Sequence, residues 1–468
     1  MERGQSTFDY DLAVIGAGSA GYAAARTAAE AGLRVAVLEG GKEIGGLCIL
    51  RGCMPTKALL YAADVLHMAR RAGTWGIQTQ GIHFDFSQVM ARKAALIAEF
   101  ARFRQQQLNK GRFKFLQASG RFVDEHTLAL STTGTITAKN FVISTGSNVS
   151  PPALPRLKEI GYLTSDTALS LAKPPRSLVV LGGGPVAVEL AQFFNRFNVK
   201  VTLVQRSEHV LHSFDASAAC VLESVFRREG MTVFTGTKLI DAWQEGGLKG
   251  VSFHHQGQVV RVAAEEILLA LGRTANIASL GLENAGVFTE GGRILTNTEM
   301  QTTAHHIYAA GDCTDPHQIV HLAVQQGEIA AHNIAHPHKK RSMDYRLLCQ
   351  VIFTDPQLAQ VGLTEKEAQV HGRACVTASY PFNDHGKSII MDALDGYVKL
   401  LADPASGEIL GGSVVGPMGG ELIHEIIAAI YQRMTVHALA AMPHYHPTLA
   451  EIWTYPAEEL ARKITPAH

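Results

Sequence analysis

The stretch Asp11-Leu-Ala-Val-Ile-Gly-Ala-Gly-Ser-Ala-Gly21 decides the fold of this chain. Its first five residues form a largely apolar, partly β-branched run, which predicts a short buried strand. Three glycines follow at once, and the alanine-rich residues 22–31 predict a helix. A second apolar run at residues 34–39 predicts the next strand. This strand–helix–strand pattern predicts a parallel sheet of the α/β class.

The glycine spacing is that of a dinucleotide-binding turn. Gly16 makes the tight turn, Gly18 lets a pyrophosphate approach the backbone beside Ser19, and Gly21 lets the helix pack closely on the strand. The N–H groups and the dipole at the helix N-terminus favour phosphate binding. Glu39 closes the second strand, where a carboxylate can bind a ribose 2′-OH. A glycine-rich turn without a ligand is the alternative.

The same pattern recurs further along the chain. Residues 177–181 predict a strand, the following turn contains Gly182 and Gly184, and residues 188–197 predict a helix. Ala187 stands at the third glycine position, which the pattern permits. Two fingerprints this far apart predict two nucleotide-binding domains.

The end of the second strand in this repeat bears on the choice between NAD and NADP. The sequence there is Gln205-Arg-Ser207, at the place where an NAD site carries an acidic residue. A neutral residue followed by the cation Arg206 favours the 2′-phosphate of NADP. A solvated surface arginine is the other interpretation, so NADPH is favoured and NADH stays open.

Two cysteines lie close together after the first unit, in Gly45-Gly-Leu-Cys-Ile-Leu-Arg-Gly-Cys-Met-Pro-Thr-Lys57. Five residues of regular helix rise roughly 7.5 Å. That exceeds the usual Cα separation of a disulfide, so a bond between Cys48 and Cys53 requires a distorted backbone. Gly52 makes such a distortion possible. The spacing permits a disulfide without requiring one.

The surroundings of the two thiols favour redox chemistry. Arg51 and Lys57 are expected to lower the thiol pKa and to raise reactivity. A structural zinc site would need two further ligands, and the sequence shows no second close pair with zinc-finger spacing. Two inert thiols are the third interpretation. The remaining cysteines are isolated in sequence and are interpreted as inert core thiols: Cys220, Cys313, Cys349 and Cys375.

A candidate proton carrier lies near the other end, in Met442-Pro-His-Tyr-His-Pro-Thr-Leu-Ala-Glu451. Thiol–disulfide exchange needs a group that moves a proton to and from sulfur. The imidazole of His446 titrates in the right range, and Glu451 can hold its tautomer. Taken alone, the stretch would be interpreted as a structural loop with surface histidines. The catalytic interpretation depends on the presence of the thiol pair elsewhere in the chain.

Composition excludes several classes. The 468 residues suggest roughly three domains. Lys plus Arg number 42 and Asp plus Glu number 42, so the basic footprint of a nucleic-acid partner is absent. The N-terminus has no apolar core like that of a signal peptide, and no apolar run approaches a membrane span. The cytoplasm is therefore the expected location.

With these motifs assembled, the chain resembles the FAD-dependent pyridine nucleotide–disulfide oxidoreductases, the family of dihydrolipoamide dehydrogenase, glutathione reductase and mercuric reductase. The resemblance covers nearly the whole length. The most specific elements are the C-x4-C-x-P-x-K segment, Thr145-Gly146, Ala310-Gly-Asp312 and His446-Pro-Thr-x-x-Glu451.

The resemblance implies an α/β fold with two Rossmann-like domains and a C-terminal α+β domain. The expected order is an FAD-binding domain in residues 1–149, an NAD(P)-binding domain in 150–272, a central return in 273–342 and a dimerisation domain in 343–468. The implied assembly is a homodimer that binds FAD and a nicotinamide.

Roles for individual residues also follow from the resemblance. Cys48 meets the substrate and Cys53 faces the flavin. Lys57 lies beside flavin N5 and pairs with Glu189, and Asp312 holds the ribityl chain. His446 and Glu451 act on the disulfide of the other subunit. Further implied cofactor contacts are Gly46, Thr145, Gly146, Gly272 and Gly311.

Departures from the family pattern concern the substrate. Glu328 stands where glutathione reductases carry an arginine, and Pro185 replaces the tyrosine that gates the nicotinamide in several members. The tail lacks the cysteine pair of mercuric reductases, whereas 416–421 and 444–451 are most like dihydrolipoamide dehydrogenase. We therefore expect a dihydrolipoamide-like disulfide or dithiol. The alternatives are an NADPH-dependent reductase of another disulfide, a mercuric reductase relative, or a flavoprotein sensor without turnover.

Overall fold

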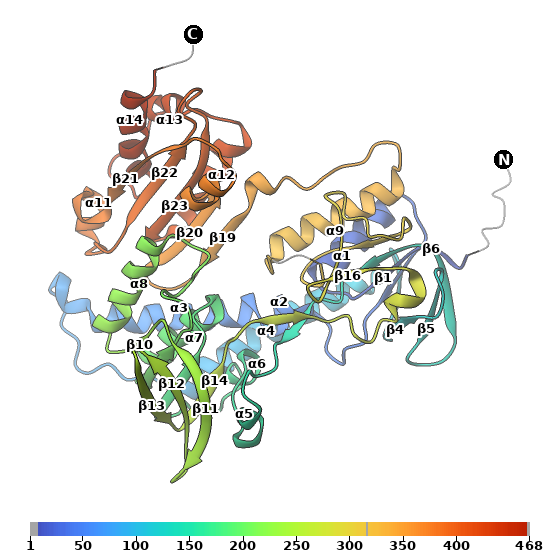
Figure 1. The fold of residues 1–468 in the computed structure, drawn as a ribbon, viewed down its shortest axis with the longest axis horizontal. Coiled ribbons are helices and arrows are strands. Elements are labelled where there is room, and N and C mark those ends of the chain that lie inside the picture. Colours follow the sequence, from blue (N-terminus) through green and yellow to red (C-terminus); the bar gives the residue numbers. More distant parts are fainter. Residues whose placement is uncertain (1–7, 315–316, 466–468) are drawn as a thin grey trace. The chain divides into compact units, whose positions relative to one another are not determined.

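The computed structural model describes residues 8–314 and 317–465. By internal contacts the chain divides into two compact units, each built from three segments (Figure 1). The first comprises residues 1–56, 90–151 and 272–343, and the second comprises 57–89, 152–271 and 344–468. The four-part division at residues 149, 272 and 342 stays a prediction.

A seven-stranded sheet forms the centre of the first unit. Strand β1 (Tyr10–Ile15) pairs in parallel with β2 (Val35–Leu38) and with β6 (Thr135–Ile143). The other members are β3 (Lys114–Leu116), β4 (Gly120–Phe122), β5 (Thr127–Leu130) and β18 (Ile307–Ala309). Strand β18 pairs in parallel with β6 and so returns a distant segment to the sheet. Strands β4, β5 and β6 form an antiparallel meander.

Helices connect and cover this sheet. Helix α1 (Ser19–Glu30) links β1 to β2, and α9 (Val320–Ala335) packs against α1. A Cβ added to Gly327 would lie 2.2 Å from the carbonyl oxygen of Ala20, so the two helices approach as closely as glycine allows. The remaining elements are α2 (Gly46–Leu50), β7 (Ser147–Val149), β15 (Arg273–Ala275), η2 (Leu282–Ala285), β16 (Thr289–Glu290) and β17 (Arg293–Ile294). Helices α3 (Cys53–Arg70) and α4 (Phe86–Leu108) cross the division between the units.

The second unit contains the second parallel sheet, in the order β10-β9-β8-β14. Its strands are β8 (Ser177–Leu181), β9 (Lys200–Val204), β10 (Thr232–Phe234) and β14 (Glu266–Leu269). The helices around it are η1 (Ala72–Trp75), α5 (Pro155–Ile160), α6 (Ser165–Ala168), α7 (Pro185–Arg196) and α8 (Ala216–Arg228). A separate antiparallel sheet follows, with β11 (Lys238–Glu245), β12 (Leu248–His255) and β13 (Gln258–Ala264).

The C-terminal part of the same unit is an antiparallel five-stranded sheet, β19-β20-β23-β22-β21. Its strands are Cys349–Ile352, Gln357–Gly362, Ile409–Gly416, Tyr397–Ala402 and Val376–Pro381 in that order. Its α-helices are α10 (Glu365–Val370), α11 (Gly386–Ile390), α12 (Gly419–Tyr431), α13 (Val436–Ala441) and α14 (Thr454–Lys463). The short 3-10 helices are η3 (Tyr345–Leu347), η4 (Phe382–Asp384) and η5 (Ala450–Trp453). The fully buried Trp453 lies in the core of this part.

The predicted fold class is confirmed. Strands β1 and β2 are apolar because both faces of a parallel sheet are covered, and from Leu12 to Ile15 every residue is buried. The helix expected at 22–31 begins earlier, at Ser19, because the glycine turn leads directly into it. Within the described residues, no helix combines the length and the apolar character that a bilayer span requires.

Candidate redox site and nucleotide-binding turns

The three glycines of the first turn differ in what surrounds them: two are tightly packed against backbone atoms, and one faces open space. Gly16 has φ +105°, and a Cβ there would lie 2.4 Å from the carbonyl oxygen of Ser144. A Cβ on Gly21 would lie 1.8 Å from the carbonyl oxygen of Gly16. Gly18, by contrast, has the ordinary φ of −66°, and its nearest neighbour would be the Cα of Gly46 at 3.9 Å. The space beside Gly18 is therefore open.

The hydrogen-bonding groups around this open space suit a dinucleotide. Helix α1 begins at Ser19, and its N-cap Gly18 has no side chain to cap the helix N–H groups. Glu39 lies at the end of β2, where its Oε2 accepts a hydrogen bond from the N–H of Ala17 (3.1 Å) and its Oε1 from the N–H of Gly41 (2.9 Å). A carboxylate fixed in this way can accept from a ribose hydroxyl.

A second group of residues completes the flavin candidate site. The hydroxyl oxygen of Thr145 is buried and has no hydrogen-bond partner among the described residues. Gly146 (φ +70°) and Gly311 (φ +81°) hold backbone conformations that favour glycine. An orphaned buried hydroxyl beside two such turns fits a bound polar group, because buried polar atoms are normally paired. FAD therefore fits the residues present.

The structure adds two residues that sequence reasoning missed. The hydroxyl of Ser147 donates to Asp312 Oδ2 at 2.6 Å and accepts from Arg273 Nε at 2.8 Å. Arg273 also donates to the carbonyl oxygen of Ser147 at 2.7 Å. This arrangement orients Asp312 and follows Gly272, whose φ of +111° turns the chain into β15. The Leu271-Gly272-Arg273 segment was the available signal, but nothing local linked it to Asp312.

The two thiols lie where two helices meet. Helix α2 ends at Leu50 and α3 begins at Cys53, so the backbone between the cysteines is not one regular helix. This is the kind of backbone distortion that a disulfide between Cys48 and Cys53 would require. Both cysteines are free thiols and are half-buried. Hydrogen bonding to Cys53, together with burial, raises the pKa of the Cys48 thiol well above its ordinary value, so Cys48 holds its proton while the pair is reduced.

The expectation that neighbouring cations lower the thiol pKa is wrong for Cys48. Arg51 forms an exposed ion pair with Glu43. The cation that does act on Cys48 is Arg104, from α4, and its charge opposes the rise only in part. Arg51 is close to Cys48 in sequence but does not lower its pKa, because the Arg51 side chain pairs with Glu43.

The core-thiol interpretation of the isolated cysteines is partly wrong. Cys313 and Cys349 are buried, and burial raises the pKa of each to about 11. Cys375 is half-buried, and Cys220 is exposed with its sulfur 3.7 Å from His209 Nδ1. The surface position of Cys220 on α8 explains the difference, because isolated spacing says nothing about which helix face a residue occupies.

Lys57 and Glu189 lie together within the second unit. Lys57 Nζ donates to Glu189 Oε1 at 3.0 Å and to Oε2 at 2.9 Å. The N–H of Phe353 also donates to Glu189 Oε1 at 2.9 Å, and Lys57 Nζ lies 4.5 Å from the centre of the Phe353 ring. Glu189 thus fixes the direction of the lysine side chain.

The C-terminal histidine pair divides into two different sites. His446 Nδ1 lies 3.0 Å from Glu451 Oε2 and 3.2 Å from Oε1, and its side chain is 77% exposed. An imidazole held at Nδ1 and exposed elsewhere can exchange a proton with a ligand through Nε2. His444 instead pairs with Glu425 at 2.6 Å.

Sequence reasoning missed His385. This side chain is fully buried, with Nε2 3.4 Å from Glu451 Oε1 and Nδ1 2.8 Å from the hydroxyl of Ser388. Burial lowers the pKa of His385 and favours its neutral form. His385 therefore lies beside Glu451 Oε1, the same oxygen that His446 Nδ1 approaches at 3.2 Å. Its separation of 66 positions from Glu451 (451 − 385) left no local signal.

The second glycine turn has the same arrangement as the first, with one tightly packed glycine and one glycine that faces open space. Gly182 has φ +118°, and a Cβ there would meet the carbonyl oxygen of Ala270 at 2.3 Å, whereas Gly184 has nothing within 4 Å. Ala187 is fully buried at the third glycine position. Arg206 is exposed just after β9, with no ion pair found for it in the described parts of the chain. The turn fits a nicotinamide dinucleotide.

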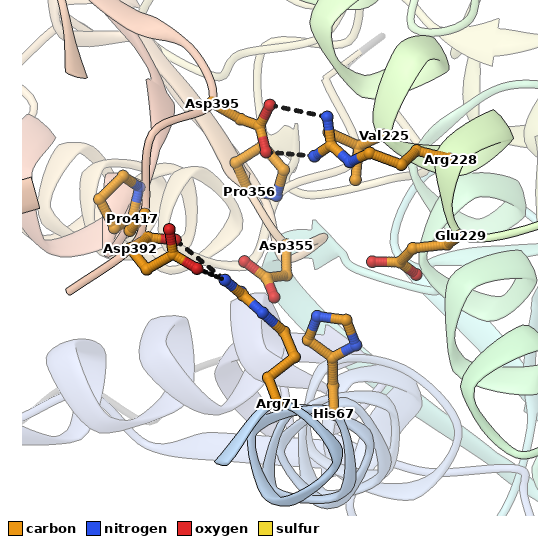
Figure 2. A pocket seen from close by; sticks show the side chains of 11 residues that line it. His67, Arg71, Val225, Arg228, Glu229, Asp355, Pro356, Asp392, Asp395 and Pro417 are labelled. Carbon is orange, nitrogen blue, oxygen red and sulfur yellow. Dashed lines mark hydrogen bonds and ion pairs between the residues drawn. The ribbon is translucent and has the colours of Figure 1, made fainter. Parts of the chain in front are cut away.

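An ionic cluster around the buried Arg196 in the second unit was also missed. Arg196 is 3% exposed and lies 2.8 Å from Asp64, 2.7 Å from Glu229 and 2.8 Å from Asp355. A cavity of about 70 Å³ lies beside it, and Figure 2 shows His67 and two further arginine–aspartate pairs around that cavity. Burial, opposed in part by Arg196, raises the pKa of Asp64 to about 6. The cluster ties α3, α7 and the segment after β19 together.

Two family matches now identify the chain. Residues 10–327 match the pyridine nucleotide-disulphide oxidoreductases, and residues 348–457 match the dimerisation domain of the same family. This chain belongs to the pyridine nucleotide-disulphide oxidoreductase family. Members are FAD-dependent enzymes that use NAD(P)H, and the dimerisation domain indicates a homodimer.

Several relatives of the family are similar over nearly the whole chain. A dihydrolipoyl dehydrogenase of Bacillus subtilis is 34% identical over 95% of this chain and 96% of its own, and a mercuric reductase of Staphylococcus aureus is 33% identical over 95% and 81%. Among solved structures, LpdA from Mycobacterium tuberculosis superposes with a TM-score of 0.86 at 28% identity, over 96% of this chain and 99% of LpdA. The flavoprotein disulfide reductase RclA from Escherichia coli superposes with a TM-score of 0.85 at 25% identity, over 96% and 99%.

Proposed function

We propose that this protein passes two electrons between a nicotinamide and a small disulfide or dithiol of the dihydrolipoamide type. The observation that carries the proposal is the placement of two half-buried free thiols, Cys48 and Cys53, at the junction of α2 and α3, in a chain with two open dinucleotide turns. The similarity to dihydrolipoyl dehydrogenases over 95% of the chain supports the substrate class.

In the proposed reaction, bound FAD would carry two electrons between the nicotinamide and the two thiols. Cys48 attacks one sulfur of the substrate disulfide and forms a mixed disulfide, while the other substrate sulfur leaves as a thiolate. Cys53 then attacks Cys48, which releases the second substrate sulfur and forms the Cys48–Cys53 disulfide. The substrate gains two electrons and two protons, and the cysteine pair loses them. The same steps run backwards for a dithiol.

Residues of this chain would bind the flavin and transfer protons to and from the thiols. Cys48 loses its proton at the moment of attack, and His446 of one subunit moves protons at the thiols of the other, held by Glu451. Neutral His385 keeps that carboxylate available to His446. Asp312, which Ser147 orients, would hold the flavin side chain, and Lys57, which Glu189 orients, would lie beside the flavin.

The choice of nicotinamide and the cellular location belong to the same proposal. Arg206 lies exposed after β9, where a cation can meet a 2′-phosphate, and this supports NADPH over NADH. We place the enzyme in the cytoplasm, where a close cysteine pair is more often catalytic than structural. The four domains follow the boundaries at 149, 272 and 342.

The test is an anaerobic titration of the FAD-loaded protein with NADPH and, separately, with NADH. A long-wavelength charge-transfer band after two electrons is expected in the wild type and is expected to be lost in Cys53→Ser. Direct bleaching of the flavin without the band in the wild type would contradict thiol coupling. Turnover of lipoamide is then compared with that of glutathione disulfide and Hg(II), and a preference for either of the latter would overturn the substrate class.

A further inference from the structure

A cavity of about 410 Å³ lies beside Cys48 in the first unit. It is formed by α1, α2, the start of α3, α4 and α9, which Figure 1 labels. Its apolar walls are Ile49, Met54, Phe100, Phe103, Val320 and Val324. Such a volume suits a small ligand, and mostly apolar walls with a few polar groups are typical of ligand pockets.

The polar side chains of the cavity are not equivalent. Arg26 is neutralised, because its Nη2 forms an ion pair with Glu328 Oε1 at 2.5 Å. Arg104 has no carboxylate partner among the described residues, and its guanidinium carbon lies 4.1 Å from the centre of the Tyr22 ring. Its Nη1 is buried and makes no hydrogen bond within the described chain. Arg104 therefore carries the uncompensated positive charge of this cavity.

An unpaired charged donor in a partly dehydrated place is costly, because it loses water without gaining an acceptor. Burial lowers the pKa of Arg104, which reflects that cost. An anionic ligand group would supply the missing acceptor. The apolar walls would in turn accept a short hydrocarbon chain that joins this anion to a sulfur at Cys48.

We propose that Arg104 is the specificity-determining residue of this cavity and selects disulfides that carry a carboxylate on a short apolar chain. The inference rests on the proposed disulfide exchange at Cys48 and names its substrate class. The favoured probe is the lipoate anion, and lipoamide is the neutral comparison of nearly the same shape.

Arg104 also acts electrostatically on Cys48, so binding of an anion must be separated from tuning of the thiol. Alkylation of the reduced, FAD-loaded enzyme makes this separation. The Cys48 sulfur displaces iodide from either anionic iodoacetate or neutral iodoacetamide, and the ratio of the two rates cancels the thiolate fraction. Trypsin cleaves after Arg51, so mass spectrometry assigns the label on Cys48 separately from that on Cys53.

Arg104→Gln is expected to lower the iodoacetate-to-iodoacetamide ratio at Cys48 by about 5- to 10-fold, because a charge in this setting attracts an anion through a reduced dielectric. Arg104→Lys should retain most of the ratio. Arg102→Gln removes an exposed cation from the same helix and should leave the ratio unchanged. An unchanged ratio in Arg104→Gln, with flavin content retained, would overturn the inference.

Steady-state turnover adds a second readout. The kcat/KM for lipoate, relative to that for lipoamide, should fall about 5- to 10-fold in Arg104→Gln. An equal loss for both substrates, with the alkylation ratio intact, would show that Arg104 tunes only the thiol and would refute the selection. If the wild type reduces neither compound but the alkylation ratio still depends on Arg104, the proposed function fails while the anion site stands.

Discussion

Substitution of Gly18 by alanine tests the proposed contact between the backbone and the flavin pyrophosphate. The backbone at Gly18 has φ −66° and ψ −165°, which alanine adopts without strain. The nearest protein atom to the added Cβ would be 3.9 Å away. The change in the free energy of unfolding of the apoprotein should therefore stay within about 0.5 kcal/mol, as for an unobstructed substitution.

The loss should appear in FAD binding instead, because the added methyl group occupies the open space that the pyrophosphate needs. A hydrogen bond to a charged group contributes about 1.5–3 kcal/mol. Loss of one such bond weakens FAD binding by roughly 10- to 150-fold. The assay is a titration of apoprotein with FAD, followed by quenching of flavin fluorescence.

Gly184→Ala is the matched control. It stands at the same place in the second turn, with nothing within 4 Å. It should keep the FAD affinity of the wild type and raise the KM for the nicotinamide. Wild-type FAD affinity in a folded Gly18→Ala protein would refute the assignment of the first turn to the flavin.

Three further predictions concern other parts of the molecule. Glu189→Ala leaves Lys57 and the N–H of Phe353 without their acceptor and should cost about 2–4 kcal/mol in urea denaturation of the holoenzyme, whereas exposed Glu159→Ala should not. The raised pKa of Asp64 makes its contribution to stability largest below pH 3.8, and that contribution is lost as pH rises through about 6. Asp64→Asn should remove this component from the pH dependence of the melting temperature, in an amount reduced by solvent because Asp64 is 44% exposed; parallel profiles would contradict it. His385→Ala should lower kcat for disulfide turnover while half-reaction with nicotinamide survives, and an unaffected kcat would refute its role beside Glu451.

Much of the fold was predictable because its signals are local. The run from Asp11 to Gly21 combines apolar strand residues, a turn that needs positive φ at Gly16, and an alanine-rich helix start. Each of these depends on residues within one or two turns of chain. A disulfide between the two thiols would similarly require a distorted backbone, and the chain has such an interruption between α2 and α3.

The sequence by itself therefore determined the family and the two dinucleotide-binding domains, and it predicted which two thiols carry the redox chemistry. Only the tertiary structure decided which charges act on those thiols. Arg51 is adjacent in sequence but pairs with Glu43, whereas Arg104 reaches Cys48 from another helix. Ser147, Arg273 and His385 were likewise invisible, because their partners are distant in sequence and their side chains carry no periodic signal. Backbone conformation follows from neighbouring residues, but the electrostatics of a site depends on which side chains the packed fold brings within a few ångströms.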